Sequence, residues 1–382
     1  MDKQRQIQQA YQTKTIINCI MRQNQTIYTG LVLAFDQHWV LLHTYNAYGL
    51  LDGYVLIRIS NIAILTDQGA DLERLKMRMQ LMTQTPILWS EDLVLPPFQQ
   101  EDLLRQVLVF LQQSKQTLLL QQLHVDGYFQ AQLLAQTSDQ ITIQALDSFN
   151  FSVTGAQTTV ELRQIVVLEF AGAQLQLATE FFQTQSPEHV ASVMVKTNEQ
   201  FPRLLARVQE QQTLVIIYCE NVQNNFFVGT ICQYNQEFAV LKLVDDLGRF
   251  GGYVLIKLAR IVYISAQNDY LRQVAYYCRY QKARMSFVQP ILNDQWRFGT
   301  DFVPETFQQL ADRKEVINCH REQKAESQLA YCQAADRQQC QLAIFYDLPE
   351  RKTAQKSFKY TQIAVVTWGY LNTFFTKHEL IG

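Results

Sequence analysis

The sequence has few charged residues and no long apolar run. Asp, Glu, Lys and Arg make up only 18% of its 382 residues. No apolar stretch approaches the ~20 residues that a membrane-spanning helix requires. The first residues, MDKQRQIQQAYQ, lack the apolar core of a secretion signal. The sequence therefore predicts a chain without a membrane anchor, located in the cytoplasm.

Cysteine is scarce and shows no paired pattern. The seven cysteines are an odd number, and none belongs to a CxxC pair. A disulfide framework or a structural zinc site would need cysteines in pairs or at regular spacings. We therefore expect reduced thiols and no metal ligands among them.

Signatures of catalysis are missing as well. The sequence contains no HExxH, no Walker-type glycine loop, no GxSxG and no GxGxxG, the motifs that would hold a metal, a phosphate, a nucleophile or a dinucleotide. His38 and His43 lie five residues apart on one expected strand, so they face opposite sides of it. We therefore expect no enzyme, and no catalytic residue, cofactor, metal or small-molecule substrate.

What the sequence does contain is enough apolar material for several cores. Hydrophobic residues make up 48% of the chain and aromatic residues 12%, and this length suits two to four domains. Residues 1–191 carry 11 Lys and Arg against 17 Asp and Glu, whereas residues 192–382 carry 22 against 18. A strongly basic nucleic-acid-binding chain is excluded, but a local basic patch in the second half is not.

A gapless internal repeat relates the two halves of the chain. Residues 28–75 align with residues 227–274 at an offset of 199. Gly30 meets Gly229, and the pentapeptide GYVLI recurs in register. Because each glycine marks a demand of the backbone, a match with glycines in register indicates a shared structure. The sequence therefore predicts a duplicated chain.

A weaker repeat relates the parts in between. RQIVVLEF at 163–170 resembles TQIAVVTW at 361–368, so we expect four modules in two pairs, with the even modules diverged. The expected boundaries are 1–68 for module 1, 69–100 for a helical connector, 101–172 for module 2, 195–267 for module 3, 268–301 for a second helical connector and 302–372 for module 4.

Each odd module is expected to hold five short strands. In module 1 they are Thr15–Ile20, Thr26–Phe35, Trp39–Tyr45, Tyr54–Ile59 and Ile62–Leu65. Gly30 marks a sharp bend in the second strand, and a turn at Ser60 and Asn61 separates the last two. Five short strands, one of them kinked, predict a small and strongly bent β-barrel.

Apolar residues at helical spacing predict a helix before each module. Such spacing occurs at Ile7 and Tyr11, and again at Phe201, Leu204 and Val208. Helices are also expected after the odd modules, at Asp71–Met82 and Asp269–Met285. The expected fold class is α+β, mainly β with helices: four bent five-stranded barrels, each preceded by a helix, in two duplicated halves.

A helix followed by five strands, with GLVLAFDQHWVLL from Gly30 to Leu42, resembles the Sm-like family and is most similar to its bacterial RNA chaperone. IRISNI, from Ile57 to Ile62, resembles the second Sm motif. The resemblance implies bent barrels that bind RNA. It also implies self-association, in which the fourth strand of one barrel pairs with the fifth strand of the next, within one chain or between chains.

The family resemblance places nucleic-acid contacts at the two motifs of each odd module. The candidates are Asp36, Gln37, Arg58 and Asn61 in module 1, and Asn235, Gln236, Lys257 and Arg260 in module 3. Asp36 and Gln37 either reach a base edge or cap a tight turn. Arg58 and Asn61 either contact RNA or are solvated.

The aromatic residue after each first motif also has two interpretations. Trp39 and Phe238 either stack on bases or belong to the core. Val40 and Ala239 stand where the family has a uracil-contacting asparagine. This departure favours a second function, a protein-interaction scaffold without a nucleic-acid ligand.

Two basic segments complete the candidates. The helix at Asp269–Met285 carries Arg272, Arg279, Lys282 and Arg284 among tyrosines, a pattern typical of single-stranded nucleic-acid binding. An expected loop carries Arg351, Lys352, Lys356 and Lys359. For both segments a solvated surface is the alternative. The sequence thus predicts binding of RNA or single-stranded nucleic acid, with the scaffold as the competing hypothesis.

Overall fold

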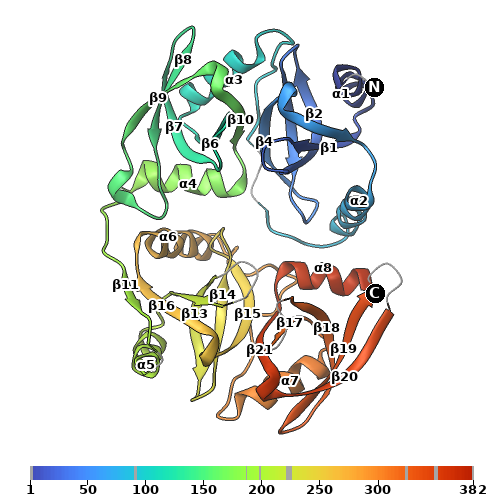
Figure 1. Cartoon of the computed structure of the whole chain (residues 1–382), viewed down its shortest axis with the longest axis vertical. Helices are drawn as coiled ribbons and strands as arrows, with labels where there is room; N and C mark the ends of the chain where they lie inside the picture. The colour runs from blue at the N-terminus through green and yellow to red at the C-terminus, as the bar shows by residue number, and fades with distance from the viewer. Residues whose placement is uncertain are drawn as a thin grey trace. The chain divides into compact units, whose positions relative to one another are not determined.

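The computed structural model describes residues 3–89, 93–185, 187–197, 199–220, 226–322, 326–347 and 352–380. The chain divides into two compact units, unit 1 (Met1–His189) and unit 2 (Val190–Gly382), which Figure 1 colours from blue to green and from yellow-green to red. Each unit is built on one large antiparallel sheet with helices around it. The expected class, mainly β with helices, is confirmed at this level.

Unit 1 holds a ten-stranded sheet in which two blocks of five strands lie side by side. The strand order is β5-β1-β2-β3-β4-β10-β6-β7-β8-β9. The strands of the first block, module 1, are β1 (Ile16–Met21), β2 (Ile27–Phe35), β3 (Trp39–Tyr45), β4 (Leu51–Arg58) and β5 (Ile62–Thr66). The strands of the second block, module 2, are β6 (Thr117–Gln122), β7 (Phe129–Gln136), β8 (Gln140–Ala145), β9 (Gln157–Glu161) and β10 (Ile165–Phe170). The blocks are joined where β4 pairs with β10.

Unit 2 repeats this order and adds one strand. The order is β11-β16-β12-β13-β14-β15-β21-β17-β18-β19-β20. The strands of module 3 are β12 (Val215–Cys219), β13 (Phe226–Tyr234), β14 (Phe238–Val244), β15 (Phe250–Lys257) and β16 (Ile261–Gln267). The strands of module 4 are β17 (Val316–Arg321), β18 (Gln328–Ala335), β19 (Gln339–Asp347), β20 (Lys352–Lys359) and β21 (Ile363–Trp368). The additional strand β11 (Val193–Val195) covers the outer edge of β16.

Among the described residues, one helix precedes and one follows every module. In chain order they are α1 (Lys3–Thr13), α2 (Ala70–Met82), α3 (Leu103–Ser114), α4 (Ala173–Thr184), α5 (Phe201–Gln211), α6 (Asp269–Ala283), α7 (Phe302–Asp312) and α8 (Leu371–Leu380). Six of them match helices expected from the sequence. The helices α4 and α8 were not expected. Buried residues of α4 include the adjacent pairs Leu177–Ala178 and Ala178–Thr179, so its sequence lacks a single apolar stripe.

The cores are shared across the junction of each pair of modules. Leu41 and Leu56 of module 1 pack in the same cluster as Leu108 of α3 and Leu168 of module 2. Val240 and Leu255 make the equivalent contribution to module 4. Each fully buried aliphatic side chain stabilises the folded state by about 1.5–3 kcal/mol relative to leaving it exposed. Shared burial therefore makes each pair of modules one compact unit.

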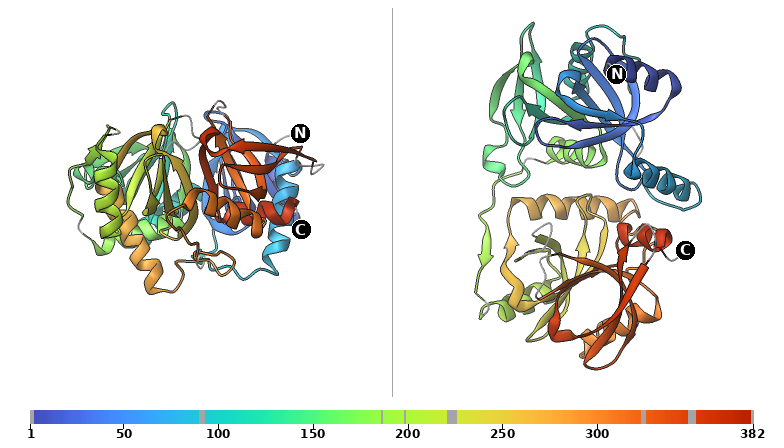
Figure 2. Two further views of the ribbon diagram at one scale, coloured as in Figure 1. Left: turned by 90° about the horizontal axis from the view of Figure 1, so that it is seen from below. Right: turned by 45° about the vertical axis from the view of Figure 1, so that its right-hand side comes forward.

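Bulges account for the strong curvature of the sheets, which is visible in Figure 2. The register of β2 against β3 shifts by one residue between Val32 and Ala34. The second strand of every other module has a bulge at the same place. A bulge increases local bending and twist. The bend expected in the second strand is therefore present, and it centres on the bulge that follows Gly30.

Gly30 serves a close approach rather than an unusual backbone angle. A Cβ atom there would lie 2.3 Å from the carbonyl oxygen of His43, and one at Gly229 would lie 2.3 Å from that of Lys242. At the position equivalent to Gly30, module 2 has Ala131 and module 4 has Ala330. The bulge therefore does not depend on glycine.

Two local expectations need correction. The basic segment from Lys352 to Lys359 is strand β20, paired along its length with β19, and not a loop; Arg351 lies outside the described residues. The fourth strand begins at Leu51 instead of Tyr54. The helices expected in the two connectors are present as α2 and α6, and a proline follows each of them, Pro86 after the first and Pro290 after the second.

All seven cysteine thiols are free, and six of them are buried. None of the helices in the described part of the chain is both long and apolar enough to cross a membrane. No group of three or more His, Cys, Asp or Glu side chains suited to a metal ion occurs among the described residues.

Candidate functional site

The junction between modules 1 and 2 positions both candidate sites. This junction, here called the seam, is the pair β4–β10, in which Ile57 lies opposite Val167 and Tyr54 opposite Phe170. Arg58 follows Ile57 at one end of the seam, and Asp52 precedes Tyr54 at the other. A cavity lies at each end.

The first cavity brings two predicted residues together. It has a volume of about 550 Å³ and is called the Arg58 cavity here. It is lined by Gln4, Gln37, His38, Trp39, Arg58, Ile59, Ser60, Leu104, Leu162 and Arg163. The backbone explains why Gln37 and Arg58 meet. The Ile59 N–H donates a 2.8 Å hydrogen bond to the His38 carbonyl, which holds the turn after β4 against the turn before β3.

Arg58 has the strongest recognition chemistry in this cavity. Its guanidinium lies 5.0 Å from the centre of the Trp39 ring, and its Nη2 donates a 2.9 Å hydrogen bond to the Leu162 carbonyl. Its buried Nε has no hydrogen-bond partner among the described residues. Burial lowers the pKa of Arg58 from its usual value, because removal from water disfavours the charged form. The guanidinium thus keeps unused donors.

Asp36 acts in local structure. Its Oδ1 accepts hydrogen bonds from the backbone N–H groups of His38 (2.8 Å) and Trp39 (2.7 Å). Its Oδ2 accepts a 2.9 Å bond from the N–H of Leu103, at the start of α3. The turn-capping interpretation therefore describes Asp36, while the neighbouring Gln37 side chain is exposed.

Asn235 has the same role in module 3. Its Oδ1 accepts hydrogen bonds from the N–H groups of Glu237 (2.8 Å) and Phe238 (2.7 Å). Gln236 beside it is exposed. Trp39 and Phe238 are 5% and 3% exposed and belong to the cores. The core interpretation therefore describes both rings, and Arg58 covers the Trp39 ring.

At the corresponding end of the junction in unit 2, a carboxylate pairs with the basic side chains. Lys257, the counterpart of Arg58, forms a 2.8 Å ion pair with Glu322. Arg260, the counterpart of Asn61, pairs with the same carboxylate. In unit 1, Asn61 is not among the residues that line the cavity, and its backbone carbonyl accepts a 2.9 Å bond from the Arg22 N–H.

The residue equivalent to Glu322 in unit 1 is Leu123. The Leu123 N–H donates to the Gln164 carbonyl at 2.8 Å, as the Glu322 N–H donates to the Gln362 carbonyl at 3.0 Å. Leu123 is 39% exposed and carries no charge. Among the described residues, no carboxylate is therefore within ion-pair distance of Arg58.

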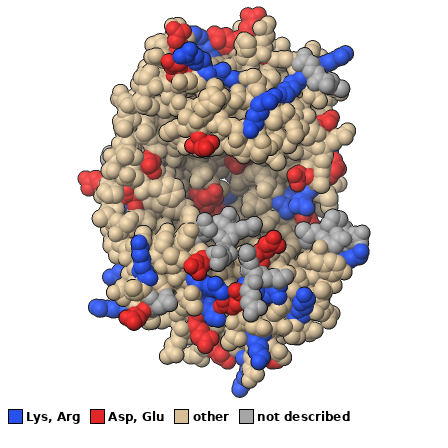
Figure 3. All heavy atoms as spheres, viewed as in Figure 1, with Lys and Arg blue, Asp and Glu red and all other residues tan. Residues whose placement is uncertain are grey.

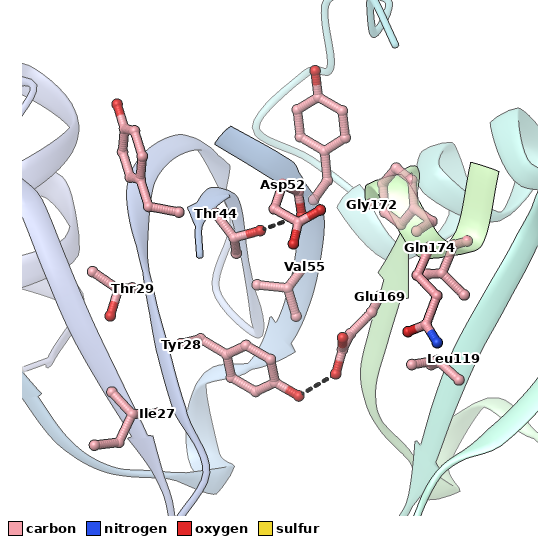
Figure 4. Close-up of a pocket in the computed structure, with 14 residues that line it drawn as sticks. Ile27, Tyr28, Thr29, Thr44, Asp52, Val55, Leu119, Glu169, Gly172 and Gln174 are labelled. Carbon is pink, nitrogen blue, oxygen red and sulfur yellow. Dashed lines mark hydrogen bonds between the residues drawn. The ribbon is translucent and has the colours of Figure 1, made fainter. Parts of the chain in front are cut away.

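The second cavity was not found by sequence reasoning. It has a volume of about 200 Å³ and is called the Glu169 cavity here. Figure 4 shows Tyr28 and Glu169 pointing toward each other across it, from β2 and β10. The Tyr28 hydroxyl lies 2.5 Å from Glu169 Oε1 and 2.6 Å from the Tyr128 hydroxyl. The available signal was the lone acid in the apolar sequence RQIVVLEF.

The predicted basic helix has an exposed cationic side. Arg272, Arg279 and Lys282 of α6 are exposed, and so is Arg284, which directly follows the end of this helix. The Arg284 guanidinium lies 4.4 Å from the centre of the Tyr280 ring, and the Lys282 ammonium 4.9 Å from that of Phe287. On the face in Figure 3, the described basic and acidic side chains are interspersed, and most of the surface is neither.

Comparisons with known proteins identify no family. No family model and no curated protein matches the sequence. Among solved structures, the chain is similar to the crystal structure of YcgR in complex with c-di-GMP from Escherichia coli, at 13% sequence identity, with 48% of this chain and 92% of that chain covered and a TM-score of 0.13. A likeness at this TM-score carries no argument about fold or ligand.

Proposed function

We propose that the chain is a non-enzymatic protein of four Sm-like modules that binds single-stranded RNA in the Arg58 cavity. Three features support Sm-like modules: a helix before each block of five strands, the strand order fifth-first-second-third-fourth, and the pairing of a fourth strand with the fifth strand of the neighbouring block. The observation that carries RNA binding is the Arg58 guanidinium, which has unused donors and no paired carboxylate within the described part of the chain.

The chemistry of the cavity suits a nucleotide. A guanidinium binds phosphate through two parallel hydrogen bonds or stacks on a base. Gln37 offers an amide to a base edge, and Arg163, although paired with Glu161 at 2.5 Å, is 82% exposed at the rim. The volume of about 550 Å³ lies within the ~300–1,000 Å³ typical of small-ligand sites.

The proposal is tested by neutralising Arg58 and, as a matched control, its counterpart Lys257. Binding of a fluorescein-labelled uridine 20-mer is measured by fluorescence polarisation from 50 to 200 mM salt. Arg58→Gln is expected to weaken binding about tenfold, equal to about 1.4 kcal/mol. It should also reduce the slope of log affinity against log salt by about 0.7, the value for one phosphate contact on a single strand.

Lys257→Gln is expected to change affinity less than twofold, because Glu322 already neutralises Lys257. Thermal melts confirm that both variants fold. RNA binding at this cavity is contradicted if Arg58→Gln keeps the wild-type affinity and salt slope, or if both variants lose affinity equally.

The second candidate function is a protein scaffold, favoured by the sheet ends of unit 1. Its ten-stranded sheet ends in β5 and β9, which lack an outer partner among the described strands. These are a fifth and a fourth strand, the kinds that pair at the seam. Open edges of this kind recruit further strands, so pairing between copies would build an assembly.

A native purification separates the two functions. The scaffold predicts a mass above 44.4 kDa by light scattering and an absorbance ratio typical of nucleic-acid-free protein. Ile64 in β5 is 55% exposed, and Ile64→Lys is expected to return such an assembly to the monomer because a charge on an edge strand blocks pairing. A monomer at every concentration that copurifies with RNA would exclude the scaffold.

A further inference from the structure

The wall of the Glu169 cavity contains two carboxyl groups and no basic side chain. Its carboxyl groups are Glu169 from β10 and Asp52 from β4, and none of its lining residues is Lys, Arg or His. Glu169 Oε1 accepts the Tyr28 hydroxyl hydrogen bond. Oε2 accepts no hydrogen bond from the described residues, although a carboxylate has about four acceptor positions. One oxygen of a largely enclosed acid is thus available to a donor.

Electrostatics also favours a cation in this position. Burial, the larger cause, and the nearby Asp52 carboxylate both raise the pKa of Glu169, while the hydrogen bond from Tyr28 lowers it. A positive charge in the cavity would offset the desolvation of one carboxylate and its repulsion by the other. Tyr45 and Tyr54 also line the space, and aromatic faces attract cations.

In unit 2, a tyrosine side chain occupies the position that corresponds to the Glu169 cavity. Glu169 pairs across the sheet with Val55 and Leu119, and the equivalent residue Thr367 pairs with Val254 and Asn318. There the side chain of Tyr370 forms hydrogen bonds with those of Thr367 and Asn318.

Unit 1 has no such ring because Gly172 stands at the position of Tyr370. The contacts of two neighbouring glycines, Gly53 and Gly252, show that Gly172 and Tyr370 are equivalent positions. A Cβ on Gly53 would contact the backbone of Ala171 and Gly172, as one on Gly252 would contact Gly369 and Tyr370. Gly172 therefore leaves space for a ring-sized group, and that space ends at Glu169 where unit 2 has a neutral threonine.

From this geometry we infer that the Glu169 cavity binds a small organic cation, a protonated amine on a ring-sized apolar body. The ring takes the place that the phenol of Tyr370 occupies in unit 2, and the ammonium donates to Glu169. This site is separate from the Arg58 cavity, since the two share no lining residue. Its test therefore stands or fails independently of RNA binding.

The test uses the full chain and benzylammonium as the probe, with benzyl alcohol as its neutral analogue. Isothermal titration calorimetry is expected to give one site per chain for benzylammonium and at least tenfold weaker binding for benzyl alcohol. Glu169→Gln is expected to weaken benzylammonium binding at least tenfold, because it removes the charge and keeps the shape. Gly172→Tyr is expected to abolish binding by filling the cavity.

Two controls separate loss of the cation site from a general effect on the fold. Tyr370→Phe in unit 2 is expected to leave binding unchanged, and circular dichroism checks that each variant is folded. Gly172→Tyr brings its Cβ 3.3 Å from Asp52 oxygens, a tight contact, so Glu169→Gln remains the deciding variant. Equal binding of benzyl alcohol and benzylammonium, wild-type affinity in Glu169→Gln, or loss of binding in Tyr370→Phe would each overturn the inference.

Discussion

Units 1 and 2 share their backbone plan and differ in the side chains at the two ends of their module junctions. Both have the order fifth-first-second-third-fourth strand twice, joined through β4–β10 or β15–β21. At one end, unit 1 has Leu123 where unit 2 has Glu322, which pairs with two cations. At the other end, unit 1 has Gly172 where unit 2 has Tyr370.

This difference teaches that a shared fold does not imply a shared function. In unit 2 a carboxylate forms ion pairs with two cations at one end, and a phenol hydrogen-bonds to Thr367 and Asn318 at the other. In unit 1 the same two places are cavities of about 550 and 200 Å³. We therefore propose that unit 1 binds ligands at these two places, whereas unit 2 pairs its own side chains there.

The largest expected effect tests the shared backbone. Gly30→Ala and Gly229→Ala should each destabilise the fold by about 3 kcal/mol, because the new Cβ would lie 2.3 Å from a backbone carbonyl oxygen and overpacking costs about 1–3 kcal/mol. Urea unfolding monitored by circular dichroism measures the change. Ala131→Gly, at the equivalent position of module 2, is the control and should lower the free energy of unfolding by only about 1 kcal/mol. Clearly unequal losses of stability in Gly30→Ala and Gly229→Ala would contradict a backbone structure shared by the two units.

The next effect comes from exchanging the residue that distinguishes the Arg58 cavity from its counterpart. Leu123→Glu should place a carboxylate near Arg58 and lower RNA affinity about tenfold, or about 1.4 kcal/mol. Glu322→Leu should free Lys257 and Arg260 and raise affinity by a similar factor. Fluorescence polarisation with the uridine 20-mer measures both. If the two exchanges move affinity in the same direction, the electrostatic contrast between the units is wrong.

A smaller effect is expected from the basic helix. Neutralising Arg279, Lys282 and Arg284 with glutamine should weaken RNA binding about threefold, since exposed charges are screened by salt. The same assay compares this with Arg74→Gln/Lys76→Gln in α2, where Lys76 already pairs with Glu73 at 2.8 Å. The α2 variant should bind like the wild type. If the α6 variant loses more RNA affinity than Arg58→Gln does, the main RNA-binding site lies in unit 2 and not at Arg58.

Sequence reasoning could predict the elements because their signals are local. Apolar-rich segments and the turn at Ser60 and Asn61 gave the strands of module 1, with ends within about three residues of the observed ones. Apolar spacing gave the four helices that precede the modules, and the helices after the odd modules were expected as well. The helix α4 was missed because it buries more than one face, and a buried helix lacks the amphipathic pattern.

The sites were harder to predict because they depend on contacts distant in sequence. The resemblance to the two Sm motifs made Gln37 and Arg58 candidates, but it could not indicate the Leu162 carbonyl, which accepts a hydrogen bond from Arg58 at a separation of 104 residues. Tyr28 and Glu169 are 141 residues apart. No spacing rule relates such residues, since only the pairing of β4 with β10 brings them together.

The smallest expected effect concerns the pH dependence of stability at Glu169. Burial raises the pKa of this carboxyl above its ordinary value, so the folded state keeps a proton at pH values where the unfolded chain has released it. Stability therefore falls as pH rises from the ordinary pKa through the raised one, and the loss is complete above it. Glu169→Gln removes this cost and should be more stable than the wild type at pH 8.

At pH 4 that advantage should largely disappear, because the wild-type carboxyl is then mostly protonated when folded. Urea midpoints of both proteins at the two pH values measure the change. Thr367→Val, at the equivalent place in unit 2, is the matched control and should show no pH-dependent difference, since threonine does not titrate. An advantage of Glu169→Gln that is equal at pH 4 and pH 8 would show that the glutamine acts through packing, and the charge contrast between the two cavities would lose its support.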